Sequence, residues 1–233
     1  LLWAVVPSAQ TLSRNAEVRS LPVMISRCLA DPDLMRLNIG VFSLHLMLTA
    51  LFVAVPSHLE AGGLHVSRHW QVYLPMLMAA FIVMVPVMLA AERRGRVREM
   101  VLMSVALLVV STLGMALTAH SLGWFLAAMM VFFVVFNLLE ANLPSLLSKT
   151  VYPGGRGTAM GIYSSFQFLG AFAGGTVSGL LVGWGGLSAV FVFCAAVALA
   201  WLLASWKLQV PVAAPSLAVD IGTDELQRNG IIE

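Results

Sequence analysis

The stretch MVLMSVALLVVSTLGMALT, residues 100–118, carries no charged side chain over its whole length. A helix needs about 20 predominantly apolar residues to cross the hydrocarbon core of a bilayer. Five more stretches of this kind surround it, at about residues 37–55, 71–91, 123–147, 158–183 and 187–206. The first of these is expected to end at Pro56. The sequence therefore predicts six transmembrane helices.

The composition supports the same class of protein. Hydrophobic residues make up 60% of the 233 residues and charged residues only 10%, whereas a soluble domain carries about 25% charged residues. The sequence contains no phosphate-binding Gly-Lys-Ser/Thr loop, no His-Glu-x-x-His pair and no Gly-x-Ser-x-Gly elbow. We therefore predict an all-α integral membrane protein that is not an enzyme, holds no cofactor or metal, and has the lipid bilayer rather than nucleic acid as its partner.

The basic residues predict the orientation of the helices. Of the 13 lysines and arginines, 12 fall on one side of the predicted spans, and only Arg68 falls in the loops of the other side. Short cytoplasmic loops are enriched in Lys and Arg. The basic side is therefore predicted to be cytoplasmic, which places both ends of this chain in the cytoplasm and the protein in the inner (plasma) membrane as a multi-pass protein.

The segments outside the spans divide the chain further. Residues 1–6 are apolar and are expected to be the end of a preceding transmembrane helix, so that the sequence looks like a fragment. Residues 7–35 form a predicted central cytoplasmic loop, residues 36–207 the six-helix bundle, and residues 208–233 a cytoplasmic tail that is expected to be disordered.

The predicted cytoplasmic loop contains a periodic apolar pattern. The apolar residues recur at helical spacing, namely Leu21, Met24, Ile25, Cys28 and Leu29. This spacing predicts a short amphipathic helix at the membrane surface, and a linker with accidental periodicity is the alternative. The sequence Asp31-Pro32-Asp33 then predicts a capping residue followed by a first-turn proline at the start of the next helix.

One acidic residue lies inside a predicted span. Glu140 falls within residues 123–147, while the other ten acidic residues lie in loops, at span ends or in the tail. A charged side chain at such a depth costs about 2.5 kcal/mol or more, and burial favours the neutral form of a carboxyl group. Glu140 is therefore a candidate for proton coupling. The alternative is a protonated side chain that bonds a neighbouring helix, through Gln167 or Tyr163.

A polar stripe and a glycine pattern mark two other spans. Asn38, His45 and Thr49 are spaced by seven and four residues, which puts them on one helical face. That face should contact protein or a water-filled cavity, and His45 serves either helix packing or transport. In residues 158–183, the pairs Gly170/Gly174 and Gly175/Gly179 would let a neighbouring helix approach closely, which favours a packing role.

The loop AERRGRVR, residues 91–98, resembles the loop signature of the major facilitator superfamily: an acid, a basic residue, a spacer, a glycine and further basic residues. Met88 stands where that signature has another glycine. The resemblance implies that Glu92, Arg93, Gly95 and Arg96 form a cytoplasmic latch whose charges engage neighbouring helix ends.

Two further stretches, NLLEANLPSLLSK at residues 137–149 and GTAMGIYSSFQFLG at residues 157–170, resemble the tenth and eleventh helices of the YajR-like drug-efflux branch of that superfamily. The likeness extends over about residues 37–206 and matches the six spans to helices seven to twelve. It implies the C-terminal half of a twelve-helix transporter, whose partner would be a missing N-terminal six-helix half.

The resemblance also implies a function. Such transporters work by alternating access, and this branch implies proton-coupled export of small hydrophobic or amphipathic molecules. Glu140 would be the proton-coupling residue, and the cavity candidates are His45, Asn137, Tyr163 and Gln167. The competing hypothesis is a non-transporting membrane scaffold or subunit, in which these polar faces contact protein permanently.

Overall fold

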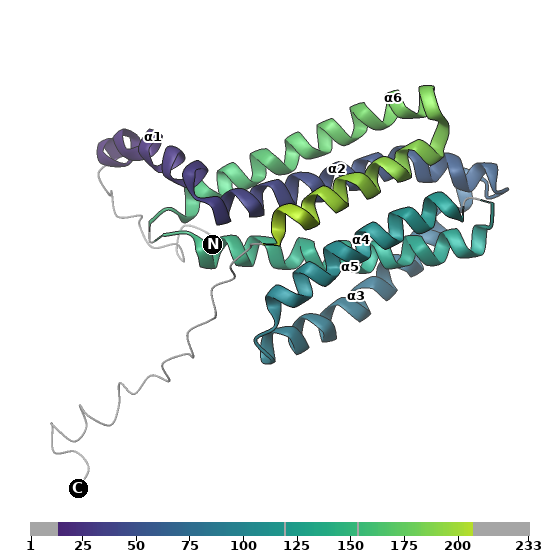
Figure 1. The fold of residues 1–233 in the computed structure, drawn as a ribbon, viewed down its shortest axis with the longest axis horizontal. Helices are drawn as coiled ribbons and strands as arrows, with labels where there is room; N and C mark the ends of the chain where they lie inside the picture. The colour runs from purple at the N-terminus through teal and green to yellow at the C-terminus, as the bar shows by residue number, and fades with distance from the viewer. Residues whose placement is uncertain (1–13, 119, 153, 207–233) are drawn as a thin grey trace, which may run out of the picture.

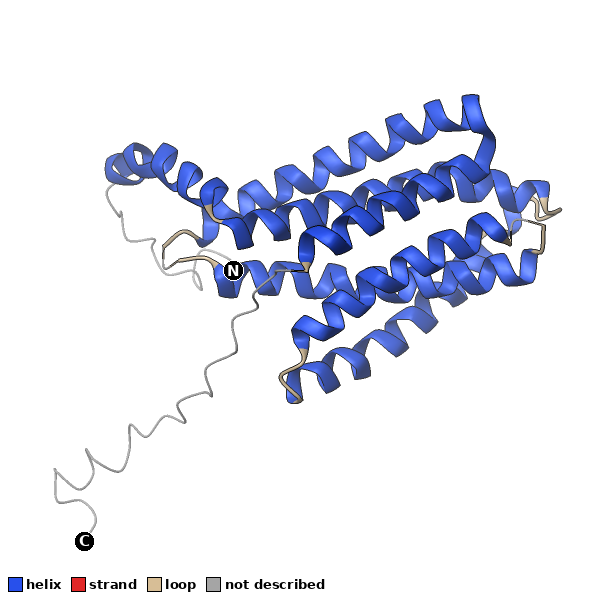
Figure 2. Ribbon diagram, viewed as in Figure 1, coloured by secondary structure: helices blue, strands red, loops and turns tan. Residues whose placement is uncertain are grey.

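The computed structural model describes residues 14–118, 120–152 and 154–206, and the described residues form helices joined by short loops (Figure 2). In chain order the elements are α1 (Arg14–Ala30), α2 (Pro32–Ala61), the 3₁₀ helix η2 (Val66–Arg68), α3 (Trp70–Arg93), α4 (Val97–Leu117), α5 (Leu122–Thr150) and α6 (Arg156–Ser205). Within the described residues, the predicted all-α architecture is confirmed.

Five helices in the described part of the chain, α2 to α6, are long and apolar enough to cross a membrane, against six predicted spans. The difference lies in α6, which is 50 residues long. A straight helix of that length would extend about 75 Å, more than twice the hydrocarbon thickness of about 30 Å. Gly186 interrupts α6 with φ 71° and ψ −172°, a conformation that glycine adopts without strain. Figure 1 shows the ribbon turning back near this point, so α6 consists of two arms.

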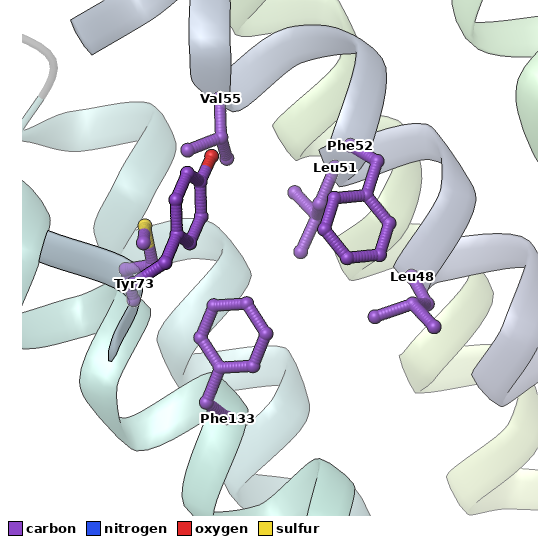
Figure 3. Close-up of a pocket in the computed structure, with 7 residues that line it drawn as sticks. Leu48, Leu51, Phe52, Val55, Tyr73 and Phe133 are labelled. Atoms are coloured by element: carbon purple, nitrogen blue, oxygen red, sulfur yellow. The ribbon is translucent and has the colours of Figure 1, made fainter. Parts of the chain in front are cut away.

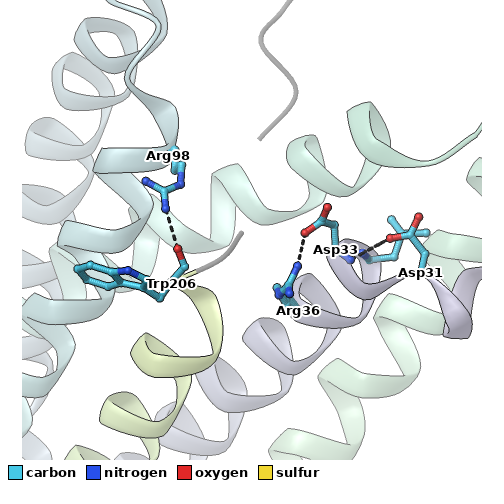
Figure 4. Close-up of polar contacts among 6 residues, drawn as sticks. Asp31, Asp33, Arg36, Arg98 and Trp206 are labelled. Carbon is cyan, nitrogen blue, oxygen red and sulfur yellow. Dashed lines mark hydrogen bonds and ion pairs between the residues drawn. The ribbon is translucent and has the colours of Figure 1, made fainter. Parts of the chain in front are cut away.

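The start of α2 follows the sequence prediction, and its end does not. The side chain of Asp31 accepts hydrogen bonds from the backbone N–H groups of Asp33 at 2.9 Å and Leu34 at 3.1 Å (Figure 4), which confirms the predicted cap. The prediction that the helix ends at Pro56 was wrong, because α2 continues to Ala61. A proline removes a single backbone donor, and neighbouring helices can support the helix around it.

The predicted amphipathic helix is present as α1 and is longer than expected. Cys28 is buried against the bundle, whereas Leu21 and Ile25 are exposed. The guanidinium carbon of Arg27 lies 5.2 Å from the ring centroid of Tyr152, in the loop between α5 and α6. This cation–π contact joins α1 to the bundle. The predictions for residues 1–6 and 208–233 lie outside the described residues.

The closest helix contact joins α2 to the first arm of α6. A Cβ atom added at Gly170 would overlap the backbone carbonyl of Phe42, and one at Gly174 would overlap that of Leu46. Two hydroxyls bond across the same contact: Thr49 donates to the carbonyl of Ala171 at 2.9 Å, and Ser178 donates to that of Ala50 at 3.1 Å. The packing role predicted for Gly170/Gly174 is confirmed.

The second glycine pair makes no such contact with the described residues. A Cβ atom at Gly175 or Gly179 would meet nothing within 4 Å. Phe168 and Phe172, also on the first arm of α6, are each 73% exposed. One face of this arm is therefore packed against α2, and another has no neighbour among the described residues.

Candidate functional site

Three polar side chains from three helices meet inside the bundle. The amide Nε2 of Gln167 on α6 lies 2.8 Å from Nε2 of His45 on α2 and 3.4 Å from Oε1 of Glu140 on α5. Nε2 of His45 and Oε2 of Glu140 are 3.7 Å apart. The sequence predicted each of these residues as a candidate, and the structure brings them together. We call them the His45–Gln167–Glu140 cluster.

The hydrogen bonds of the cluster indicate the form of the histidine. Nδ1 of His45 lies 3.2 Å from the backbone carbonyl of Val41, which can only accept a hydrogen bond. Nδ1 is therefore the donor of this bond. In the ring form that carries its hydrogen on Nδ1 alone, Nε2 accepts a bond from the amide of Gln167. The second amide hydrogen of Gln167 is directed at Glu140. Gln167 thus connects the two titratable groups.

Glu140 is only partly enclosed. Its side chain is 36% exposed, whereas that of His45 is 12% exposed. Its Oε2 atom is nevertheless buried and has no hydrogen-bond partner among the described residues. The separation of 3.7 Å from His45 exceeds a hydrogen bond, so a small movement or one bridging water would connect the two groups. The carboxyl group has one oxygen bonded to Gln167 and one available to His45.

Tyr163 and Asn137 lie beside the cluster but do not join its hydrogen bonds. Tyr163 stands four residues before Gln167 on α6, is buried, and lies close enough to Glu140 for an electrostatic interaction. Its hydroxyl has no hydrogen-bond partner in the described part of the chain. The amide of Asn137 donates to the carbonyl of Phe133 within its own helix at 2.7 Å.

Sequence reasoning missed one residue of the site. The ring of Phe136 packs edge-on against His45, with centroids 5.9 Å apart. Phe136 precedes Glu140 by four residues and therefore lies on the same face of α5. That spacing was the signal that could have identified it. The ring forms one wall beside the imidazole and limits the space in which His45 can turn.

The polar stripe of α2 faces α6, as its contacts show. His45 bonds Gln167, and Thr49 bonds the carbonyl of Ala171. Asn38 is 1% exposed, and its Oδ1 has no hydrogen-bond partner among the described residues. The stripe therefore contacts protein at Thr49 and Asn38 and reaches the cluster at His45.

Toward the Ala61 end of α2, apolar side chains replace the polar ones. A small cavity of about 10 Å³ lies between α2, α3 and α5, which is about the space that one water molecule needs. Figure 3 shows the rings of Tyr73 and Phe133 on one side of it and Leu48, Leu51 and Phe52 on the other. The hydroxyl of Tyr73 is buried without a hydrogen-bond partner in the described residues. Aromatic and aliphatic groups therefore surround this cavity.

The proposed latch residues surround a helix terminus. Gly95 has φ 64°, its N–H donates to the carbonyl of Glu92 at 3.1 Å, and the N–H of Arg96 donates to that of Ala91 at 2.9 Å. These two bonds form the glycine-capped Schellman ending of α3. The side chains of Glu92, Arg93 and Arg96 are exposed and make no hydrogen bond or ion pair with a described residue.

A different arginine of the same loop does reach a helix end. The guanidinium of Arg98 donates to the backbone carbonyl of Trp206, after the second arm of α6, at 2.7 Å (Figure 4). A cation at a helix C-terminus bonds the free carbonyl groups and offsets the negative end of the helix dipole. Arg98 is not one of the four predicted latch residues, and the helix end that it contacts belongs to this chain.

Comparison with known proteins gives a consistent result. A family model described as Major Facilitator Superfamily matches residues 37–226. The chain is 36% identical over 220 residues to the inner membrane transport protein YajR of Escherichia coli (strain K12), covering 94% of this chain and 48% of that protein. It is 31% identical over 139 residues to an uncharacterized transporter of Buchnera aphidicola subsp. Acyrthosiphon pisum (strain APS), covering 60% of this chain and 36% of the other. The chain spans about half the length of these curated relatives or less.

Proposed function

This chain belongs to the Major Facilitator Superfamily of membrane transport proteins, and we propose that it works as the C-terminal half of a proton-coupled exporter of the YajR-like branch. The observation that carries the proposal is the His45–Gln167–Glu140 cluster. It joins two protonatable groups across three membrane helices. A scaffold would have no need of such a pair.

The half-transporter proposal rests on two features. If the arms of α6 on either side of Gly186 each cross the membrane, the five apolar helices give six spans, which would correspond to helices seven to twelve of the family. The face of α6 with Gly175, Gly179 and the exposed Phe168 lacks a neighbour among the described residues. Small residues allow close approach of another helix, and we propose that the N-terminal six-helix half supplies it. The substrate site would form between the two halves.

The cluster suggests how a proton is exchanged. With its proton on the carboxyl group, Glu140 is neutral and His45 accepts the amide hydrogen of Gln167. When Glu140 releases its proton to Nε2 of His45, the products are a carboxylate and an imidazolium. Nε2 is then a donor, so the amide of Gln167 must turn its oxygen toward it. Each transfer therefore reorganises the contact between α2, α5 and α6 and couples protonation to helix packing.

The proposed cargo is a small hydrophobic or amphipathic molecule moving out of the cell. The support is the resemblance of residues 137–149 and 157–170 to the YajR-like drug-efflux branch, together with the similarity of this chain to YajR. Glu92, Arg93, Gly95 and Arg96 would be the cytoplasmic latch, with their charges engaging helix ends of the missing half. Both termini of this chain would then lie in the cytoplasm of a cell whose inner membrane holds the protein.

Cysteine accessibility separates a transporter from a scaffold. His45→Cys and Gln167→Cys should react with a small water-soluble thiol reagent in membranes that contain the complete protein, because a transport cavity becomes wet. Ala50→Cys is the matched control, since Ala50 is fully buried in the α2–α6 contact and should stay unreactive. The native Cys28 and Cys194 are buried and free. If the cysteines at positions 45 and 167 react with the reagent as slowly as the cysteine at position 50, the scaffold hypothesis is favoured.

A further inference from the structure

A long groove lies between α3, α4 and α5, away from the His45–Gln167–Glu140 cluster. Its volume is about 530 Å³, within the range of about 300–1,000 Å³ that is typical of small-molecule sites. Val83 and Val87 of α3, Met103 and Leu107 of α4, and Leu138 of α5 line it. The body of the groove is therefore apolar.

The groove has the length of a lipid chain in one leaflet. Along α3 its lining extends from Val83 to Arg94, and a helix rises 1.5 Å per residue, so these residues span about 16 Å. Half of a hydrocarbon core of about 30 Å is about 15 Å. The groove is therefore about as long as the hydrocarbon of one leaflet is thick.

The charge at the loop end of the groove is positive. Arg94 and Arg96 line this end together with Glu99. Residues 92–99 contain four arginines and two glutamates, which gives a net charge of +2. Arg94 and Arg96 are exposed, and neither makes a hydrogen bond or ion pair with a described residue. Two guanidinium groups and one carboxylate therefore stand at the mouth of an apolar groove, and neither arginine is engaged in an ion pair with a described residue.

We infer that this groove binds an anionic phospholipid, with an acyl chain between α3 and α4 and its phosphate at Arg94 and Arg96. Guanidinium groups bind phosphate oxygens in a bidentate manner, and basic pockets between transmembrane helices suit anionic lipid headgroups. A soluble phosphate would bind the arginines but would not fill the apolar groove. A lipid without net charge would fill the groove but would not neutralise the arginines.

Native mass spectrometry of the complete protein tests this inference. The protein is incubated in detergent with equal amounts of phosphatidylglycerol and phosphatidylcholine, and the ratio of the two bound lipids is measured. We expect phosphatidylglycerol to dominate. The double variant Arg94→Gln/Arg96→Gln should lower the ratio by about 30-fold, because each basic residue near a headgroup contributes about fivefold. Arg93→Gln, in the same loop but outside the groove lining, should keep the wild-type ratio.

A second pair of variants tests the groove rather than the charge. Ala90→Trp places a large ring where Ala90 lines the groove and should abolish retention of phosphatidylglycerol. Leu89→Trp, at the adjacent exposed position outside the lining, should not. Equal binding of the two lipids by the wild type, an equal loss in Arg93→Gln, or retention in Ala90→Trp would overturn the inference. Displacement of the lipid by an equal concentration of inorganic phosphate would assign the arginines to a soluble anion instead.

Discussion

The side-chain amide nitrogen of Gln167 lies 2.8 Å from Nε2 of His45, although 122 residues separate the two in the chain. Gln167 shares a face of α6 with Gly170 and Gly174, three and seven residues further on. Both glycines contact the backbone of α2. The close approach of α2 and α6 at these glycines therefore sets the distance between Gln167 and His45.

The two glycine pairs of α6 should respond differently to alanine. Gly170→Ala and Gly174→Ala should each destabilise the protein by about 1–3 kcal/mol, the usual cost of overpacking, because the new methyl group overlaps a carbonyl of α2. Gly175→Ala and Gly179→Ala should leave the stability of this chain unchanged or raise it by up to about 1 kcal/mol through helix propensity. Thermal unfolding in detergent measures both. Equal losses from the two pairs would contradict the assignment of faces.

The glycine of the loop signature should be needed for its backbone conformation. Gly95→Ala should cost about 1–2 kcal/mol, because an L-residue is strained in the left-handed region, while its side chain would meet open space. Gly123→Ala is the matched control, since Gly123 also has open space but no positive φ. Hydrogen exchange of the backbone amides at positions 95 and 96 should accelerate in the first variant only. Identical exchange in the two variants would argue against the capping role.

The predicted orientation can be measured with single cysteines in intact cells. Glu92→Cys, in the basic loop, should be shielded from a membrane-impermeant thiol reagent. Ala61→Cys and Ser121→Cys, at the opposite end of the bundle, should be labelled. The reverse pattern would mean that the excess of arginines faces outward, against the positive-inside rule.

Residues 1–233 alone should insert into a membrane without transporting. Alternating access needs a second repeat against which the first can move, and the unpacked face of α6 would lack its partner. Liposomes with this chain should show no gradient-driven movement of ethidium, and co-expression with an N-terminal six-helix half should restore it. Movement of ethidium by the chain alone would contradict this, unless crosslinking shows that two copies supply both halves.

The sequence predicted the all-helical architecture because the bilayer imposes a length and a composition on each spanning helix. The run at residues 100–118 corresponds to α4, and Asp31 caps α2 as predicted. Pro56 was misinterpreted because a proline signals a helix end only when nothing else supports the helix. The sequence predicted two spans, at residues 158–183 and 187–206, where the structure has α6. The two arms of α6 are separated by one non-helical residue, Gly186.

The site was predictable residue by residue but not as a cluster. Glu140 stood out as a carboxyl group in an apolar span, and His45 as part of a polar stripe. Their separation of 3.7 Å depends on how α2, α5 and α6 pack, which local periodicity does not encode. For the same reason the sequence could not tell Gly170/Gly174, which are packed, from Gly175/Gly179, which are not. Asn137 is a polar residue on the same helix as Glu140, but its amide donates to the backbone carbonyl of Phe133.

Proton coupling at Glu140 is tested most directly by Glu140→Gln in liposomes that contain the complete transporter. The neutral amide keeps the size of the side chain and a hydrogen bond to Gln167 but cannot release a proton. Ethidium should still bind to the variant, while its transport should no longer respond to an imposed pH gradient. Glu60→Gln, at the exposed end of α2, should behave as the wild type. Transport by Glu140→Gln with an unchanged dependence on the gradient would contradict proton coupling through this residue.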